Sequence, residues 1–403
     1  MVRVAVFSDI HCGYFSRTES FSVPGAKREE ISSADSNLEK DLIRLLVQEK
    51  PDFLLIAGDL TSVGSPQEFY ACEQEIKKIA GEIGLPTNRI ICCMGNHDID
   101  FNVINLWKSK DKLSEEILNY RKEKYQHLAS SISSFCLEHI KECQLEKKGP
   151  APFSGVYEAE DFVAIVLNTS WLCGPNQEYS HGKLSLEQLD WFEKTLDKYI
   201  SDDRKRIVLM HHHPFNYPYP TIGADISQIE EGAEFVEVAS KYRVDLVIHG
   251  HRHHPKVKTE MCDVGYPVTF FCAGSLAVNA NHRANGEIPN TIHFIDIDKN
   301  RDFFVLHNYS YSDAEGWKPM ENKRVTPMDG KMKVGKVFER TKCAEKIEVY
   351  KNQESVRLEW EKLDECLQFM RYQEVMDLLK EQLGSTHYVI GSFPGEVALL
   401  RKE

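Results

Sequence analysis

The chain has 403 residues, of which 42% are hydrophobic and 28% charged, and its 62 acidic side chains outnumber its 49 basic ones to give a formal charge of −13. This length predicts one large α/β domain with additions, or two to three units of ordinary size. The acidic surplus argues against a protein that coats duplex nucleic acid, because such binding depends on Lys and Arg that neutralise phosphates. The negative net charge is still compatible with an anionic substrate that binds at one locally positive site.

Three further features bear on location. The longest apolar runs, such as Phe53–Ala57, are far shorter than the about 20 residues of a membrane span, which predicts no membrane helix. The N-terminus runs directly into a strand pattern, without the apolar stretch and cleavage site of a signal peptide. The 11 cysteines, an odd number without a Cys-x-x-Cys pair, do not form the pattern of a disulfide framework. A cytoplasmic protein is expected.

In the first 250 residues, short apolar runs alternate with amphipathic stretches, which predicts a largely parallel or mixed sheet covered by helices. The predicted strands are, in chain order, 2–7, 53–57, 89–94, 162–167, 207–210 and 245–248. Capping patterns predict helices that begin after Ser36, Ser65 and Ser185.

Two segments interrupt this alternation. Residues 101–152 are polar and rich in Lys and Glu, which predicts a helical insertion that forms a lid over the site or an interaction surface. From Thr326 the sequence becomes charged and predicts a mainly helical extension over 326–403, separate from a domain over 1–325. Within the extension, four apolar residues recur at i, i+3 and i+4 spacing and predict one amphipathic helix: Trp360, Leu363, Leu367 and Met370. Such a face usually packs on its own domain, and contact with a protein partner or a second copy is the alternative.

Five short blocks place acid, amide or imidazole side chains where an apolar strand ends. They are Ser8-Asp9-Ile10-His11, Ala57-Gly58-Asp59-Leu60, Gly95-Asn96-His97-Asp98, Met210-His211-His212-His213-Pro214 and His249-Gly250-His251-Arg252-His253-His254. One block alone is weak evidence, because a single histidine is more often a hydrogen-bonded structural residue. Open α/β sheets bind ligands beyond the carboxyl ends of their strands, so the five blocks are expected to converge.

Together these side chains predict a site for two metal ions. Carboxylate, amide and imidazole groups suit divalent ions such as Mn, Fe, Zn or Co. Two cations about 3.5–4 Å apart need a bridging carboxylate, and Asp59, alone in its block, suits that role. Such a pair lowers the pKa of a bridging water and stabilises the charge on phosphoryl oxygens. A histidine, with an ordinary pKa of about 6.5, can then protonate the leaving group.

The order Asp-x-His, Gly-Asp, Gly-Asn-His-Asp, His, Gly-His-x-His across residues 9–253 resembles the calcineurin-like metallophosphoesterases. Residues 182–191, Gly-Lys-Leu-Ser-Leu-Glu-Gln-Leu-Asp-Trp, are similar to a helix entry of the branch related to bacterial cyclic-nucleotide phosphodiesterases. The resemblance covers roughly residues 1–298. It implies an α/β fold, a four-layer αββα sandwich of two mixed β-sheets flanked by helices, and two divalent metal ions, with Mn, Fe or Zn foremost.

The resemblance also implies a role for each matching residue. Asp9, His11 and His253 hold the first metal, Asp59 bridges, and Asn96, His212 and His251 hold the second. The family usually places the ligand of the fourth block two residues before the proline, which selects His212. The run of three histidines leaves His211 as the alternative. His97 is the acid that protonates the leaving oxygen, and Asp98 orients it.

Departures from neighbouring families narrow the implied substrate. Purple acid phosphatases carry a tyrosine ligand three residues after the bridging aspartate, where this chain has Ser62. Protein phosphatases resemble Gly-Asn-His-Glu, whereas this chain has Asp98. The expected function is therefore hydrolysis of small phosphodiesters, nucleotides or cyclic nucleotides among them, by a hydroxide that bridges the metals.

The same residues are compatible with three other functions. They are a phosphomonoesterase, a metal-dependent nuclease and, third, a non-catalytic metal-binding scaffold, which the complete ligand set and His97 disfavour. Tyr217 and Tyr219 are candidates for stacking on a base, although packing on the domain is the more common role of such residues. Cys12, directly after His11, is expected near the ions.

Overall fold

The structure is a computed structural model. It describes residues 1–27, 37–99, 151, 153–173, 181–215, 227–261, 265–283, 288–321, 326, 328–392 and 396–402. Three predictions fall outside the described residues: the helical insertion, apart from residue 151, the pair Tyr217 and Tyr219, and the cap at Ser36.

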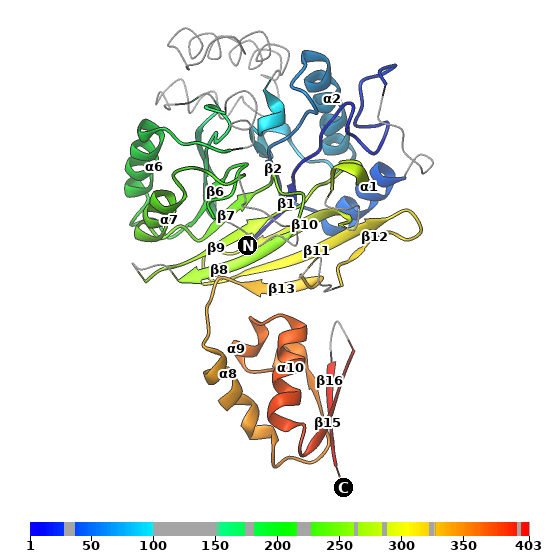
Figure 1. Ribbon diagram of the computed structural model, residues 1–403, viewed down its shortest axis with the longest axis vertical. Coiled ribbons are helices and arrows are strands. Elements are labelled where there is room, and N and C mark those ends of the chain that lie inside the picture. The colour runs from blue at the N-terminus through cyan, green and yellow to red at the C-terminus, as the bar shows by residue number, and fades with distance from the viewer. Residues whose placement is uncertain are drawn as a thin grey trace.

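The first sheet has seven strands in the order β12-β11-β10-β1-β2-β3, with β13 beside β11 (Figure 1). Its strands are β1 (Val2–Phe7), β2 (Phe53–Ala57), β3 (Ile90–Cys93), β10 (Asn290–Ile297), β11 (Phe304–Ser312), β12 (Gly316–Pro319) and β13 (Lys331–Val334). The strands β1, β2 and β3 are parallel, and the remaining pairs are antiparallel. The parallel strands end at one edge, where three of the five blocks begin.

The second sheet has six strands in the order β4-β5-β6-β7-β9-β8. Its strands are β4 (Gly155–Glu158), β5 (Phe162–Val166), β6 (Lys205–Leu209), β7 (Leu246–His249), β8 (Lys256–Met261) and β9 (Pro267–Cys272). The four central strands are parallel, and the two edge strands are antiparallel to their neighbours. The last two blocks follow β6 and β7.

Alternation along β5 shows how the layers pack. Ala164 belongs to the apolar cluster that holds the side chains of β1–β3, whereas its neighbour Ile165 packs with Phe192 and Phe235 on the opposite face. Successive strand residues face opposite sides, so the two sheets pack face to face with helices outside. Figure 1 shows these helices: α1 (Leu38–Glu49), α2 (Pro66–Glu82), α6 (Leu186–Lys198) and α7 (Gly232–Lys241). The predicted αββα sandwich is confirmed.

Two helix starts follow the capping patterns of the sequence. The Ser65 side chain accepts the Glu68 backbone N–H at the start of α2, and Ser185 accepts that of Gln188 at α6. In return, the side chains of Glu68 and Gln188 accept the backbone N–H of Ser65 and Ser185. Each pair of bonds satisfies two backbone N–H groups that would otherwise have no partner at the start of the helix. Short 3₁₀ turns are η1 (Thr87–Arg89), η2 (Asn96–Asp98), η4 (Ala280–His282), η6 (Glu348–Tyr350) and η7 (Trp360–Lys362).

The C-terminal unit contains a sheet as well as helices, so the prediction of a mainly helical extension is only partly right. Three antiparallel strands, in the order β14-β16-β15, accompany three helices. The elements are α8 (Arg340–Ile347), β14 (Val356–Glu359), α9 (Glu365–Gln368), α10 (Tyr372–Leu383), β15 (His387–Ser392) and β16 (Glu396–Arg401).

The single helix predicted across residues 360–370 is wrong. The side chain of Asp364 accepts the backbone N–H of Cys366 and starts the short helix α9, so the chain turns before it. The four apolar residues of the stripe nevertheless lie in or against the core of the C-terminal unit. These apolar residues therefore pack on the C-terminal unit itself.

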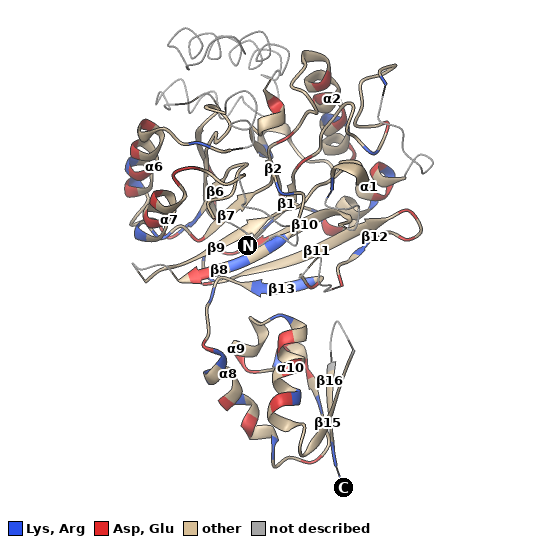
Figure 2. Cartoon of the chain, viewed as in Figure 1, with Lys and Arg blue, Asp and Glu red and all other residues tan. Residues whose placement is uncertain are grey.

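Strand β13 lies beyond the predicted boundary at residue 325 and still pairs with β11, so the first sheet extends past that boundary. Figure 2 shows that β13, coloured blue at its lysines, lies on the side of the sheets that is nearest the C-terminal unit. Lys331 lies 3.0 Å from a carboxylate oxygen of Glu361, and the backbone N–H of Tyr372 donates to Asp329 at 2.8 Å. Polar contacts thus join the unit to the sheet.

Within the described ranges, no helix combines the length and the apolar character needed to cross a membrane. The eight cysteines described there are all buried and free of disulfide bonds. Cys12 is fully buried in the apolar core and interacts with the thiol of Cys72 on α2. Its side chain therefore packs as a small apolar residue.

Candidate metal centre

The predicted site residues all follow the carboxyl ends of strands, and both sheets contribute. Asp9 and His11 follow β1, Asp59 follows β2, Asn96 and His97 follow β3, His211 and His212 follow β6, and His251 and His253 follow β7. The convergence expected from the strand order is present in the structure.

The backbone at these positions is unusual. Five candidate ligands have a left-handed backbone: φ is 49° at Asp9, 50° at His11, 52° at Asp59, 69° at His251 and 49° at His253. Such angles are uncommon outside glycine and cluster at functional sites. No pattern in the sequence indicates them.

The first group of ligand atoms comes from Asp9, His11, Asp59 and His253, which offer atoms within 4.8 Å of one another. His253 Nε2 lies 3.1 Å from Asp9 Oδ1 and 3.1 Å from His11 Nε2. The other ring nitrogen of His253, Nδ1, donates to the carbonyl of His282 at 2.7 Å. Its Nε2 is therefore the ring nitrogen that faces Asp9 and His11, in the position from which it would bind a cation.

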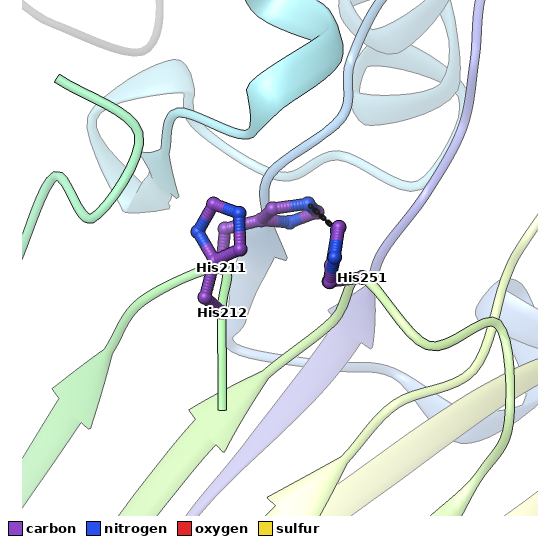
Figure 3. A group of neighbouring side chains, drawn as sticks. All are labelled: His211, His212 and His251. Carbon is purple, nitrogen blue, oxygen red and sulfur yellow. Dashed lines mark hydrogen bonds between the residues drawn. The ribbon is translucent and has the colours of Figure 1, made fainter. Parts of the chain in front are cut away.

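The second group centres on His211. Its Nδ1 donates to the carbonyl of Ala57 at 2.8 Å, so Nε2 is the ring nitrogen that faces the other ligand groups and would bind a cation on losing its proton. That atom lies 3.1 Å from Asn96 Oδ1, 3.2 Å from His251 Nδ1 and 3.2 Å from Asp59 Oδ2. Figure 3 shows the contact between His211 and His251 as a dashed line.

His212, the ligand selected from the family pattern, stands beside this group. Its ligand atom lies within 4.8 Å of those of His211 and His251. Its Nδ1 pairs with the Thr169 hydroxyl at 2.8 Å, and its buried Nε2 has no hydrogen-bond partner. A histidine that binds a metal usually donates its other N–H to a carboxylate or a backbone carbonyl. His211 meets that description through the Ala57 carbonyl, whereas the partner of His212 is a hydroxyl.

Asp59 joins the two groups. Its Oδ2 lies 3.4 Å from His11 Nε2 and 3.2 Å from His211 Nε2, and its Oδ1 accepts the backbone N–H of His97 at 2.8 Å. Burial opposes ionisation, but the attraction of His211 and His97 outweighs it and holds the pKa of Asp59 well below its usual range. In return, Asp59 raises the pKa of His211 to about 9 against the effect of burial. An ionised carboxylate therefore lies between the two histidine clusters.

Gly95 is sterically required here. A Cβ at this position would stand 2.1 Å from Asp59 Oδ1, far inside contact distance. The glycine of the Gly-Asn-His-Asp block thus lets the turn approach the shared carboxylate.

His97 and Asp98 lie on the 3₁₀ turn η2, next to Asn96. The Nδ1–H of His97 donates to the backbone carbonyl of Ser62 at 2.8 Å. Asp98 accepts the Thr61 backbone N–H at 2.9 Å and the Gly95 backbone N–H at 2.9 Å. Asp98 thus binds the backbone on both sides of the turn that carries His97, and the imidazole ring of His97 contacts the Ser62 carbonyl. Burial and the nearby Asp59 raise the pKa of Asp98 to about 7.

The donor set fits divalent cations. Both groups offer carboxylate, imidazole and, in the second, amide oxygen, which suit ions such as Mn, Fe and Zn. Burial lowers the pKa of His11 and His251 well below the usual value, so these rings are neutral and able to coordinate. The supporting carbonyls of Ala57, Ser62 and His282 were not predicted, because a backbone group leaves no sequence signal.

Known proteins share this framework. The family model for calcineurin-like phosphoesterases matches residues 2–255. A probable cyclic nucleotide phosphodiesterase of Synechococcus sp. is 26% identical over 267 residues, which are 63% of this chain and 80% of that protein. One of Rhodococcus erythropolis is 23% identical over 240 residues, 59% of this chain and 62% of that protein.

Among solved structures, a dimetal phosphatase from Danio rerio is 12% identical, with a TM-score of 0.48 over 83% of this chain and 98% of that one. The family model spans more than half of the chain and includes all five blocks. The chain therefore belongs to the calcineurin-like phosphoesterases, a family of metal-dependent hydrolases that act on phosphoester bonds.

Proposed function

We propose that this protein is a two-cation phosphodiesterase that acts on nucleotide-like or other small diesters. The observation that carries the proposal is the position of one buried carboxylate oxygen, Asp59 Oδ2, within 3.4 Å of imidazole nitrogens from both ligand groups. The two curated relatives, both described as probable cyclic nucleotide phosphodiesterases, support a diester as substrate.

The proposed ligands follow from the geometry. Asp9, His11 and His253 hold one cation, Asn96, His211 and His251 hold the other, and Asp59 serves both. His211 replaces His212 in this proposal because its Nε2 faces Asn96, Asp59 and His251 while its Nδ1 is bound to a carbonyl. Manganese, iron and zinc are the expected metals.

Two dications held by these residues would acidify a water molecule and neutralise phosphoryl charge. The chain itself holds the ligands and supplies a proton. His97 donates that proton from Nε2 to the leaving oxygen, since its Nδ1–H stays bound to the Ser62 carbonyl. Asp59 Oδ1 binds the backbone N–H of His97 and so couples the acid to the ligand set.

The test uses full-length protein, stripped with a chelator and reconstituted with Mn²⁺, Fe²⁺, Zn²⁺ or Co²⁺. We expect two ions per chain and faster hydrolysis of bis(p-nitrophenyl) phosphate than of p-nitrophenyl phosphate. Asp59→Asn is expected to lose metal and lower kcat roughly 10³-fold, because it weakens both ligand groups. Cyclic nucleotides and single-stranded DNA then distinguish a nucleotide phosphodiesterase from a nuclease.

The matched control is His307→Gln, which removes an imidazole on β11 that binds Asp296 outside the site. This variant should retain two ions and near-normal kcat. Protein that is inert with every metal would contradict the proposal, and preference for the monoester would favour the phosphomonoesterase alternative.

A further inference from the structure

One loop, residues 59–62, holds His97 at three polar atoms. The backbone N–H of His97 donates to Asp59 Oδ1 at 2.8 Å, and its carbonyl accepts the Thr61 hydroxyl at 3.0 Å. Its ring Nδ1 lies 2.8 Å from the Ser62 carbonyl. Each of these three bonds goes to a different residue of the same loop, which also carries the carboxylate shared by both ligand groups.

We propose that the Thr61-Ser62 step is the positioning device of the general acid, and this inference rests on the proposed function. A carbonyl oxygen only accepts, so Nδ1 of His97 keeps its hydrogen in both the neutral and the charged ring. The transferred proton therefore comes from Nε2. Its N–H bond breaks, an O–H bond forms on the leaving oxygen, Nε2 keeps the electron pair, and solvent later restores the proton.

The Ser62 side chain connects this device to the first ligand group. Its hydroxyl donates to the carbonyl of His11 at 2.8 Å and accepts the backbone N–H of Phe15 at 3.0 Å. The backbone N–H of Ser62 donates to the carbonyl of Cys12 at 3.0 Å. Ser62 is fully buried, so these bonds are shielded from water and fix the distance between the acid and the ligand loop.

The Thr61 hydroxyl also binds the turn that carries His97 and Asp98. Its hydroxyl contacts both the carbonyl of His97 and Asp98 Oδ1 at 3.0 Å, and it accepts the backbone N–H of Gly64 at 3.1 Å. Thr61→Val keeps the shape of this buried side chain and removes these bonds, whereas Thr61→Ser keeps the hydroxyl. The pair separates hydrogen bonding from packing.

The experiment compares two diesters that differ only in the leaving group, methyl p-nitrophenyl phosphate and methyl phenyl phosphate. The nitrophenolate departs without a proton, whereas the more basic phenolate needs the acid. We expect Thr61→Val and Ser62→Ala to lower kcat for the phenyl ester roughly tenfold more than for the nitrophenyl ester, a part of the about 10²-fold or greater effect of a general acid. Thr61→Ser should restore the wild-type ratio.

His97→Ala sets the largest leaving-group effect, and each variant must retain two ions per chain. If His97→Ala shows the effect but Thr61→Val and Ser62→Ala slow both esters equally or not at all, the positioning role is overturned while the proposed function stands. If the wild type hydrolyses neither diester, the proposed function itself fails.

Discussion

The loops of the metal centre and the C-terminal unit over residues 340–402 are built on opposite principles. The loops bury charge: Asp9, Asp59 and His211 are each at most 1% exposed. The C-terminal unit has a core of aliphatic side chains such as Leu379 and Val397. One region therefore carries the buried charged groups and the strained backbone of the candidate ligands, and the other is stabilised by the burial of apolar side chains.

The largest expected effect on stability lies in the C-terminal unit. Leu379 on α10 is fully buried, and Leu379→Ala should lower the free energy of unfolding by about 2–5 kcal/mol, through lost burial and the cavity left behind. Urea unfolding of the full chain measures it. Because the residue lies outside the loops, kcat for a diester should not change, and a fall in kcat would show that the two regions are coupled.

The part of the protein that contains the two large sheets should lose stability in acid. Burial of His293 on β10 outweighs its contacts with Asn308 and the Ala273 carbonyl and lowers its pKa to about 4. Unfolding returns the pKa to about 6.5, so below that pH the unfolded state binds a proton that the folded state does not. The contribution of His293 to the free energy of unfolding is therefore fully present above pH 6.5. It falls by up to about 3 kcal/mol as the pH drops to 4.

Unfolding curves at several pH values measure this slope, and His293→Gln should reduce it. Leu379→Ala is the control, since loss of a neutral side chain shifts stability equally at every pH. An unchanged slope in His293→Gln would remove His293 as its source.

A smaller expected effect distinguishes neighbouring histidines within the loops. His211→Ala should lower kcat roughly 10²-fold and release metal, because it removes a ligand, whereas His212→Ala should cost less than about tenfold. Metal analysis beside the kinetics checks the assignment. The reverse order would make His212 the ligand and restore the assignment made from the family pattern.

The sequence predicted features that depend on local chemistry or on a general rule of folds. The capping boxes at Ser65 and Ser185 are local, and the convergence of the five blocks follows from parallel strands. The sequence does not decide between His211 and His212, because the contact that favours His211 in our proposal is made by the backbone carbonyl of Ala57, on another strand. The chain turn at Asp364 was missed, because apolar spacing alone does not show where one helix stops and another begins.

The left-handed backbone of the five candidate ligands has a consequence for protein engineering. Each such residue costs about 1 kcal/mol or more, so together they consume about 5 kcal/mol, a large share of an ordinary domain's stability. Backbone hydrogen bonds between the loops hold these residues in place. The N–H of Asp9 donates to the carbonyl of Gly58 at 3.1 Å, and the N–H of His11 donates to the backbone carbonyl of Asp59 at 3.0 Å. Grafted into a scaffold without these bonds, the same motifs would relax to ordinary backbone angles, so the site is not portable without its framework.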